Sequence, residues 1–98
     1  MAMEPIKKLV IRHERMDDGY SEFTVGIDDS GSLVLEGVDA GEEVRRLFGD
    51  WDYEYWLTIP AEYRESVLLY LIKERFSSVH DMREWLKEKD IPCEFTSY

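Results

Sequence analysis

The segment WDYEYWLTIP, residues 51–60, is the most aromatic part of the chain, and its side chains alternate in character. In an extended backbone one side carries Tyr53, Tyr55, Leu57 and Ile59, and the other carries Asp52, Glu54, Trp56 and Thr58. This alternation predicts a central, half-buried strand with one apolar face and one acidic, aromatic face. Pro60 cannot donate a ladder hydrogen bond and suits the first turn of a helix, so we expect the strand to end there.

Three more strands are expected ahead of this segment. Residues 6–16, 20–28 and 32–38 each alternate apolar and polar side chains, as half-buried strands do. An Asp-Asp-Gly turn at 17–19 and an Asp-Ser-Gly turn at 29–31 separate them, and their glycines supply the positive φ that tight turns favour. Three strands joined by two short turns predict an antiparallel meander.

Helical spacing of apolar residues occurs in three other places. Residues 40–48 predict a short helix that Gly49 is suited to cap at its C-terminus. Residues 60–76 carry the widest apolar stripe of the chain and predict a longer helix. Residues 79–89 predict a third helix, with Ser78 in the position of its N-cap.

The end of the chain completes the predicted fold. Residues 93–98 are expected to form a closing strand at a sheet edge, where the preceding Pro92 is tolerated. A length of 98 residues suits one domain with one core. The sequence therefore predicts a single α+β domain, residues 1–98, with a four- to five-stranded, mostly antiparallel sheet and helices packed on one face. The predicted element order is βββ-α-β-α-α-β.

The chain is strongly acidic, with 22 Asp and Glu against 12 Lys and Arg and a formal net charge of −10. Such a surface repels nucleic-acid phosphates and anionic lipid and steers basic partners in, although the same charge could serve only to keep the protein soluble. No run is apolar enough to cross a membrane, and the first residues lack the apolar stretch of a signal peptide. The single cysteine, Cys93, excludes an internal disulfide. We therefore expect a cytosolic protein without nucleic-acid or membrane partners.

The outward side of the sheet is the candidate binding surface. If helices cover the apolar side, the opposite side faces solvent, and we expect Arg12 and Glu14 to lie on it. The candidate partner-binding residues on this side are Glu22, Glu36, Glu54, Trp56, Glu94 and Tyr98. An aromatic side chain ringed by carboxylates suits contact with a basic protein. The alternative is that Trp56 and Tyr98 cover each other and neighbouring basic stems, in a small cluster with no binding role.

No catalytic or metal-binding pattern stands out. Glu54 and Glu94 could be cross-strand neighbours, but paired acids on an open sheet are usually solvated. Cys93 could act as a nucleophile only if His13 or His80 came within reach, and a lone cysteine on a strand is more often a small buried hydrophobe. The Asp-Asp-Ser-Gly-Ser run before the third strand lacks the alternate acids and distal Glu of a calcium loop. We therefore expect no enzyme, no metal and no cofactor.

The C-terminal half, from FGDWDYEYW at residues 48–56 onward, resembles small uncharacterised bacterial domains. The resemblance rests on the acidic, aromatic strand, on Phe76, on the helix around Trp85 and on the ending IPCEFTSY. Those domains are broadly similar to immunity proteins that neutralise toxins. The resemblance implies a small acidic α+β binding protein of bacterial origin, and it assigns no functional residue.

These observations favour a non-enzymatic, cytosolic binding module whose acidic, aromatic surface engages a basic protein, such as a toxic nuclease. The alternative is a homo-oligomeric accessory protein, in which the closing strand or the Trp56 face pairs with a second copy in a homodimer. A third interpretation is a hydrolase using Glu54 with a neighbouring acid, or Cys93, and it requires a deep pocket beside these side chains.

Overall fold

The computed structural model describes residues 4–97 and has an α+β fold, as predicted. The chain divides into two compact units. We call Ile6–Arg64 the sheet unit, and Glu65–Tyr98 together with the first five residues the helical unit. Each unit is described by itself, and the prediction that 1–98 is a single domain stays a prediction.

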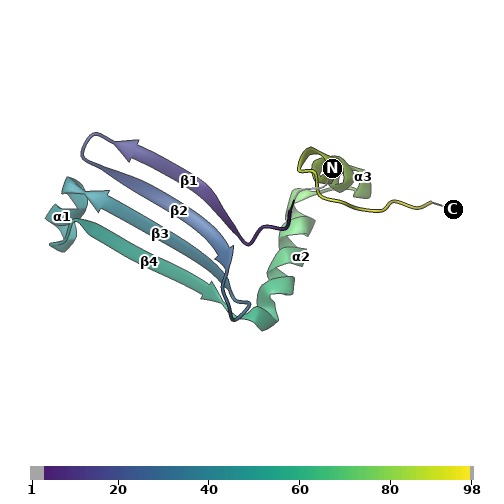
Figure 1. Cartoon of the computed structure of the whole chain (residues 1–98), viewed down its shortest axis with the longest axis horizontal. Coiled ribbons are helices and arrows are strands. Elements are labelled where there is room, and N and C mark those ends of the chain that lie inside the picture. Colours follow the sequence, from purple (N-terminus) through teal and green to yellow (C-terminus); the bar gives the residue numbers. More distant parts are fainter. Residues whose placement is uncertain (1–3, 98) are drawn as a thin grey trace. The chain divides into compact units, whose positions relative to one another are not determined.

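The sheet unit contains a four-stranded antiparallel meander in the order β1-β2-β3-β4 (Figure 1). The strands are β1 (Lys8–Met16), β2 (Gly19–Ile27), β3 (Leu33–Gly41) and β4 (Asp52–Ile59). Their alternation and the two short turns confirm the meander expected from the sequence. In the second turn, the Asp28 carboxylate accepts hydrogen bonds from the backbone N–H groups of Ser30 and Ser32 at 3.0 and 2.9 Å. This run is therefore a hairpin turn, as predicted.

A short helix, α1 (Glu42–Phe48), joins β3 to β4 and packs against both strands at one end of the sheet (Figure 1). Gly49 ends the helix with φ of 87°, and its N–H donates to the Arg45 carbonyl at 2.9 Å, which confirms the predicted cap. The Phe48 ring stacks on the Tyr53 ring with centroids 4.7 Å apart. This stack attaches α1 to the sheet face that carries Tyr53 and Tyr55.

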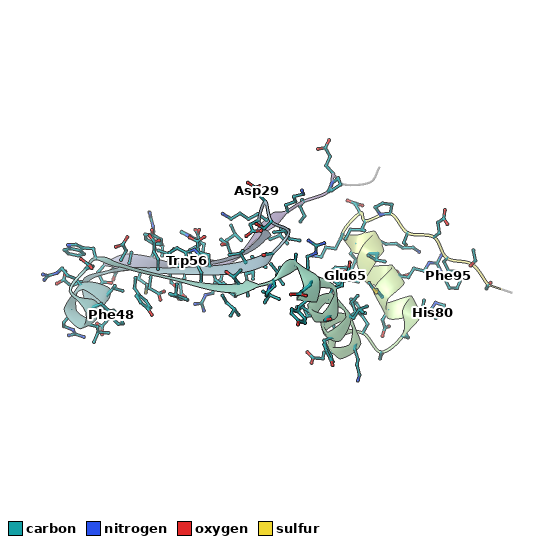
Figure 2. The ribbon with its side chains drawn as sticks, turned by 90° about the horizontal axis from the view of Figure 1, so that it is seen from below. Asp29, Phe48, Trp56, Glu65, His80 and Phe95 are labelled. Atoms are coloured by element: carbon teal, nitrogen blue, oxygen red, sulfur yellow. The ribbon has the colours of Figure 1, made fainter. Side chains whose placement is uncertain are left out.

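The register separates the two faces of the sheet. One face carries two apolar rows that run across the strands, formed by Leu9, Val25, Leu35 and Leu57 and, beside them, by Ile27, Leu33 and Ile59. We call this the apolar face. Phe23, Tyr55 and Tyr53 continue it towards α1. The opposite face carries Trp56 and the acids described below. Figure 2 shows side chains projecting from both faces of the sheet.

An irregularity in β1 changes which residues share a face. The pairing shifts between Val10 and Arg12, so that Arg12 pairs with Phe23 and His13 pairs with Glu22. The expectation that Arg12 and Glu14 lie on the Trp56 face is therefore wrong. A bulge inserts one unpaired residue, and every side chain beyond it changes face.

Tyr55 lies flat on the sheet because its cross-strand neighbour is a glycine. Gly37 pairs with Tyr55 in register, and the tyrosine ring occupies the space that a Cβ at Gly37 would need. The Tyr55 hydroxyl donates to Asp39 at 3.2 Å, and the Ser21 hydroxyl donates to the same carboxylate at 2.7 Å. Burial, followed by the hydrogen bond to Asp39, raises the pKa of Tyr55. The ring thus fills a gap in the apolar face and fixes the pairing of β3 with β4.

The helical unit contains α3 (Val79–Glu88) and all of α2 (Arg64–Arg75) except its first residue. A short 3-10 turn, Ala61–Tyr63, precedes α2 at the end of the sheet unit. Ser78 caps α3 as predicted, because its hydroxyl accepts the Asp81 N–H at 3.0 Å. The Phe76 and Trp85 rings meet edge to face with centroids 5.6 Å apart. No helix within residues 4–97 has the length and apolar character needed to span a membrane.

The predicted closing strand over 93–98 is wrong for its described part, because residues 91–97 have no regular secondary structure. Tyr98 lies outside the described residues. Asp90 adopts a left-handed conformation, with φ of 58°, and Pro92 offers no N–H to a neighbouring strand. The alternation of this segment suits a strand, but a strand needs a partner, and none pairs with it among residues 4–97.

Neither unit encloses a large apolar side chain among the described residues. In the sheet unit only Thr24 and Gly37 are buried, and both lie on the central strands β2 and β3. Within this unit α1 covers one end of the apolar face, through Phe48 and Tyr53. No other element of the sheet unit covers the apolar rows through Leu35 and Leu33. The sequence-based expectation that helices pack over these rows stays a prediction.

Replacing Gly37 by alanine should destabilise the sheet unit by about 1–3 kcal/mol, because the added Cβ overlaps the Tyr55 ring. Urea unfolding followed by circular dichroism measures this loss. Gly26→Ala is the control for adding a methyl group to a strand, and it should cost less, since its Cβ would meet the Lys7 carbonyl oxygen in a tight contact at 3.1 Å rather than lie inside an aromatic ring. In a Tyr55→Ala background the Gly37→Ala cost should disappear, and a cost that persists there would contradict the ring's role.

Removing the Ser77 hydroxyl should raise the pKa of Asp81, which that hydroxyl lowers most strongly by donating to the carboxylate at 2.6 Å. Because the folded-state pKa is lowered, the stabilisation is present above the unfolded-state pKa and is lost as pH falls through the folded value. A carbon-detected NMR titration of Asp81 in Ser77→Ala measures the change. Ser77→Thr keeps the hydroxyl and should leave the pKa low; an equal rise in both variants contradicts the assignment.

Candidate binding face

Four of the predicted binding residues lie on one face of the sheet, opposite the apolar face. We call this the acidic face and define it by Glu22, Glu36, Glu54 and Trp56. Glu22 comes from β2, Glu36 from β3, and the other two residues from β4. The register of the strands puts these residues on the same face. Glu36 pairs with Trp56, and in the next row Val38 pairs with Glu22 on one side and with Glu54 on the other.

Trp56 is 57% exposed, and it shares this side of the sheet with one other large aromatic side chain, Tyr20. Glu36 lies directly across from it on β3, and Glu54 lies two residues before it on the same face of β4. Directly paired side chains in a sheet have Cβ atoms about 5 Å apart, so the Glu36 carboxylate is within reach of the indole. The arrangement is an exposed aromatic surface bordered on two sides by negative charge.

The three acids of the face differ in their partners. Glu22 is engaged by His13, whose Nδ1 lies 2.8 Å from its Oε2, and the His13 ring stacks on Tyr20 at 5.9 Å. Within residues 4–97, Glu36 and Glu54 form no ion pair. These two carboxylates are therefore free to receive a cation from outside, whereas a ligand for Glu22 has to compete with His13.

Charge is unevenly distributed over this side of the sheet. The β3–β4 half holds Glu36, Glu54 and Asp52 without a basic residue among its paired positions. The β1 edge brings basic residues to the same side, because Lys8 pairs with Gly26 and Arg15 pairs with Tyr20. The negative potential is consequently concentrated around Trp56 rather than spread over the whole face.

Two predicted binding residues are not part of the acidic face. Glu94 lies in the segment without regular structure and belongs to the helical unit, so the expected cross-strand pair of Glu94 with Glu54 does not exist within the sheet. Tyr98 lies outside the described residues, and its contact with Trp56 stays a prediction. The bulge replaces Arg12 by His13 on this side, and no local feature of the β1 sequence signals that exchange.

The residues considered for chemistry are divided between the two units, with His13 and Glu54 in the sheet unit and His80, Cys93 and Glu94 in the helical unit. Cys93 is exposed rather than buried, so the interpretation as a small core residue is wrong. His13 is in the sheet unit, bound to Glu22, and His80 stacks on Phe95 with centroids 5.6 Å apart. In the described part of the chain, no group of three His, Cys, Asp or Glu is placed to hold a metal ion.

One concave feature was not predicted from the sequence. A groove of about 370 Å³ lies within the helical unit and is mostly apolar, with Ile72, Phe76, Met82 and Leu86 among its lining residues. Cys93 and Phe95 reach it from the C-terminal segment, and the Arg83 guanidinium lies 4.6 Å above the Phe95 ring. The helical stripes predict these apolar positions, but they do not predict that the segment after α3 returns beside the helix.

Comparison with known proteins finds no matching protein-family model, no matching curated protein and no matching solved structure.

Fluorescence quenching tests the geometry of the acidic face. In a protein retaining only Trp56 (Trp51→Phe, Trp85→Phe), caesium ions should quench the indole more strongly than iodide, because carboxylates surround an exposed ring. Adding Glu36→Gln and Glu54→Gln should reduce this preference for the cation. The variant retaining only Trp85, which packs on Phe76, serves as the control. Trp56 emission that neither ion quenches would contradict an exposed site.

Proposed function

We propose that the protein is a non-enzymatic binding module whose acidic face engages a basic protein. The observation that carries this proposal is the exposed indole of Trp56 with two carboxylates beside it on an open sheet surface, those of Glu36 and Glu54, which form no ion pair within residues 4–97. Exposed tryptophans are frequent anchors of protein interfaces, and neighbouring carboxylates confer selectivity for partners that carry Lys or Arg.

The same arrangement supports a protein partner over a small molecule or a nucleic acid. Small ligands are held in concave sites that enclose most of their surface, whereas the hollow of about 200 Å³ beside Glu36 is not lined by Trp56 or Glu54. The net charge of −10 opposes association with phosphates and accelerates encounter with a basic surface. The proposed class of partner is therefore a folded basic protein that presents a lysine or arginine to each free carboxylate.

Inhibition of a toxic nuclease is the form of this function that we favour. Nucleases that act on nucleic acids carry basic surfaces, and an acidic protein binds such a surface by imitating the charge of the substrate. The resemblance of the C-terminal half to immunity-type domains supports this form. The protein would then act in the bacterial cytosol by occupying the toxin's substrate-binding surface, without chemistry of its own.

The test is a protection and binding experiment with a basic nuclease domain encoded beside this chain's gene. Co-expression should protect cells from that nuclease, and the affinity should fall steeply as salt rises. Trp56→Ala and Glu54→Lys should each weaken binding at least tenfold, as expected for central interface residues.

The matched control for this experiment is Glu14→Lys, which makes the same change of charge on the opposite face of the sheet. This variant should retain most of the affinity, since it alters only the long-range field. Affinity that is independent of salt, or that Glu14→Lys and Glu54→Lys reduce equally, would rule out the acidic face as the contact site.

A further inference from the structure

A hollow of about 290 Å³ lies within the sheet unit, at the end of the sheet where α1 joins β3 to β4 (Figure 1). We call it the α1 hollow. Its lining is mostly apolar, comes from α1 and from the strands beside it, and includes Val44, Leu47, Phe48, Met16 and Tyr53. All its described lining residues belong to the sheet unit, so this unit forms the hollow by itself.

Charge distinguishes the α1 hollow from other hollows in the described part of the chain. Its described lining includes three acids, Asp18, Asp39 and Glu43, and neither a lysine nor an arginine. Four other hollows each have at least one lysine or arginine in their lining, and two of these four lie on the same sheet. The excess of acids in the whole chain therefore does not by itself account for a lining without bases.

The Asp39 carboxylate is held in place by neutral groups. It accepts hydrogen bonds from the Ser21 and Tyr55 hydroxyls at 2.7 and 3.2 Å. Within residues 4–97, neither Asp39 nor Asp18 forms an ion pair. An ionised carboxylate has about four acceptor sites, so Asp39 can accept further donors. Because its position is already fixed, a cation can bind to it without ordering the side chain first.

The charges around the α1 hollow leave its surroundings negative. Glu43 is paired with Arg46 of the same helix, whose Nη2 lies 2.7 Å from its Oε1, so these two charges offset each other. On the sheet, Glu14 lies in the cross-strand row of Asp39, and Arg12 lies in the next row of the same face. Arg12 is therefore a competing cation, but it forms no ion pair with Asp39.

We propose that the α1 hollow binds a small organic cation, in which an ammonium group is joined to an aromatic or branched aliphatic body. The apolar lining accepts the body, and Asp39 and Asp18 attract the ammonium group. The Phe48 and Tyr53 rings add attraction for a cation, because the face of an aromatic ring is negative. The volume is near the lower limit of ligand sites, so the ligand is small.

This site goes beyond the proposed function and is independent of it. None of the residues that define the acidic face lines the α1 hollow. Failure of the nuclease experiment would leave the α1 hollow as a ligand site, and a protein that binds no organic cation could still use its acidic face.

Amide NMR of the full chain at neutral pH tests the site with three probes of similar size: phenethylamine, a cation; phenethyl alcohol, which is neutral; and phenylpropionate, an anion. Phenethylamine should shift the amides of Val44 and Leu47 until they saturate. The alcohol should bind more weakly, and phenylpropionate about tenfold more weakly than the amine, because it meets two acids without bases. Equal binding of cation and anion, shifts confined to the groove of the helical unit, or no saturable shift with phenethylamine would each overturn the proposal.

Two substitutions in one turn locate the charge that the ligand meets. Asp18→Asn should weaken phenethylamine binding about threefold, as expected for a partly exposed ion pair, and the resulting Asn-Gly sequence still suits the turn. Asp17→Asn is the matched control, because it makes the same change of charge beside the hollow without altering its described lining. Val44→Trp should abolish binding by filling the hollow. Equal losses from Asp17→Asn and Asp18→Asn would reflect net charge alone and would overturn the assignment.

Discussion

The pairing of β3 with β4 is the constraint on which the other features of the sheet unit depend. Its register places Glu36 opposite Trp56 and Gly37 opposite Tyr55. A shift of one residue would exchange the faces of β4, sending the indole to the apolar side and setting Tyr55 against a side chain instead of a glycine. Because the flat Tyr55 ring fits only over Gly37, and its hydroxyl finds Asp39 there, the aromatic strand has one preferred alignment.

This alignment gives the sheet two faces with different physical roles. The acidic face holds an exposed indole and two carboxylates, Glu36 and Glu54, that form no ion pair within residues 4–97. The apolar face holds rows of aliphatic side chains, and its burial has to supply much of the stability of a unit that encloses no large apolar side chain by itself. The two sides of this one layer thus differ in their chemistry.

The bulge in β1 places Arg12 and His13 on the faces opposite to those that simple alternation along the strand predicts. Arg12 and His13 follow each other in a regular alternation, yet the bulge brings Arg12 to the side of Tyr55 and His13 to Glu22. The result removes a permanent cation from the acidic face and replaces it with a histidine. Bulges depend on how a strand meets its neighbour, so alternation within one strand does not predict them.

Local pattern was sufficient to predict most elements: the alternating segments before Pro60 are strands, Gly49 and Ser78 cap the helices where expected, and Glu54 and Trp56 share a face of β4 because they are two residues apart. These features depend on interactions within a few residues or on a simple period of two. Tertiary structure decided three other features: the sheet face on which Arg12 lies, the packing of the Tyr55 ring over Gly37, and the absence of a strand over residues 93–97. Each depends on a partner distant in sequence, and a strand pattern without a neighbour to pair with remains an irregular segment.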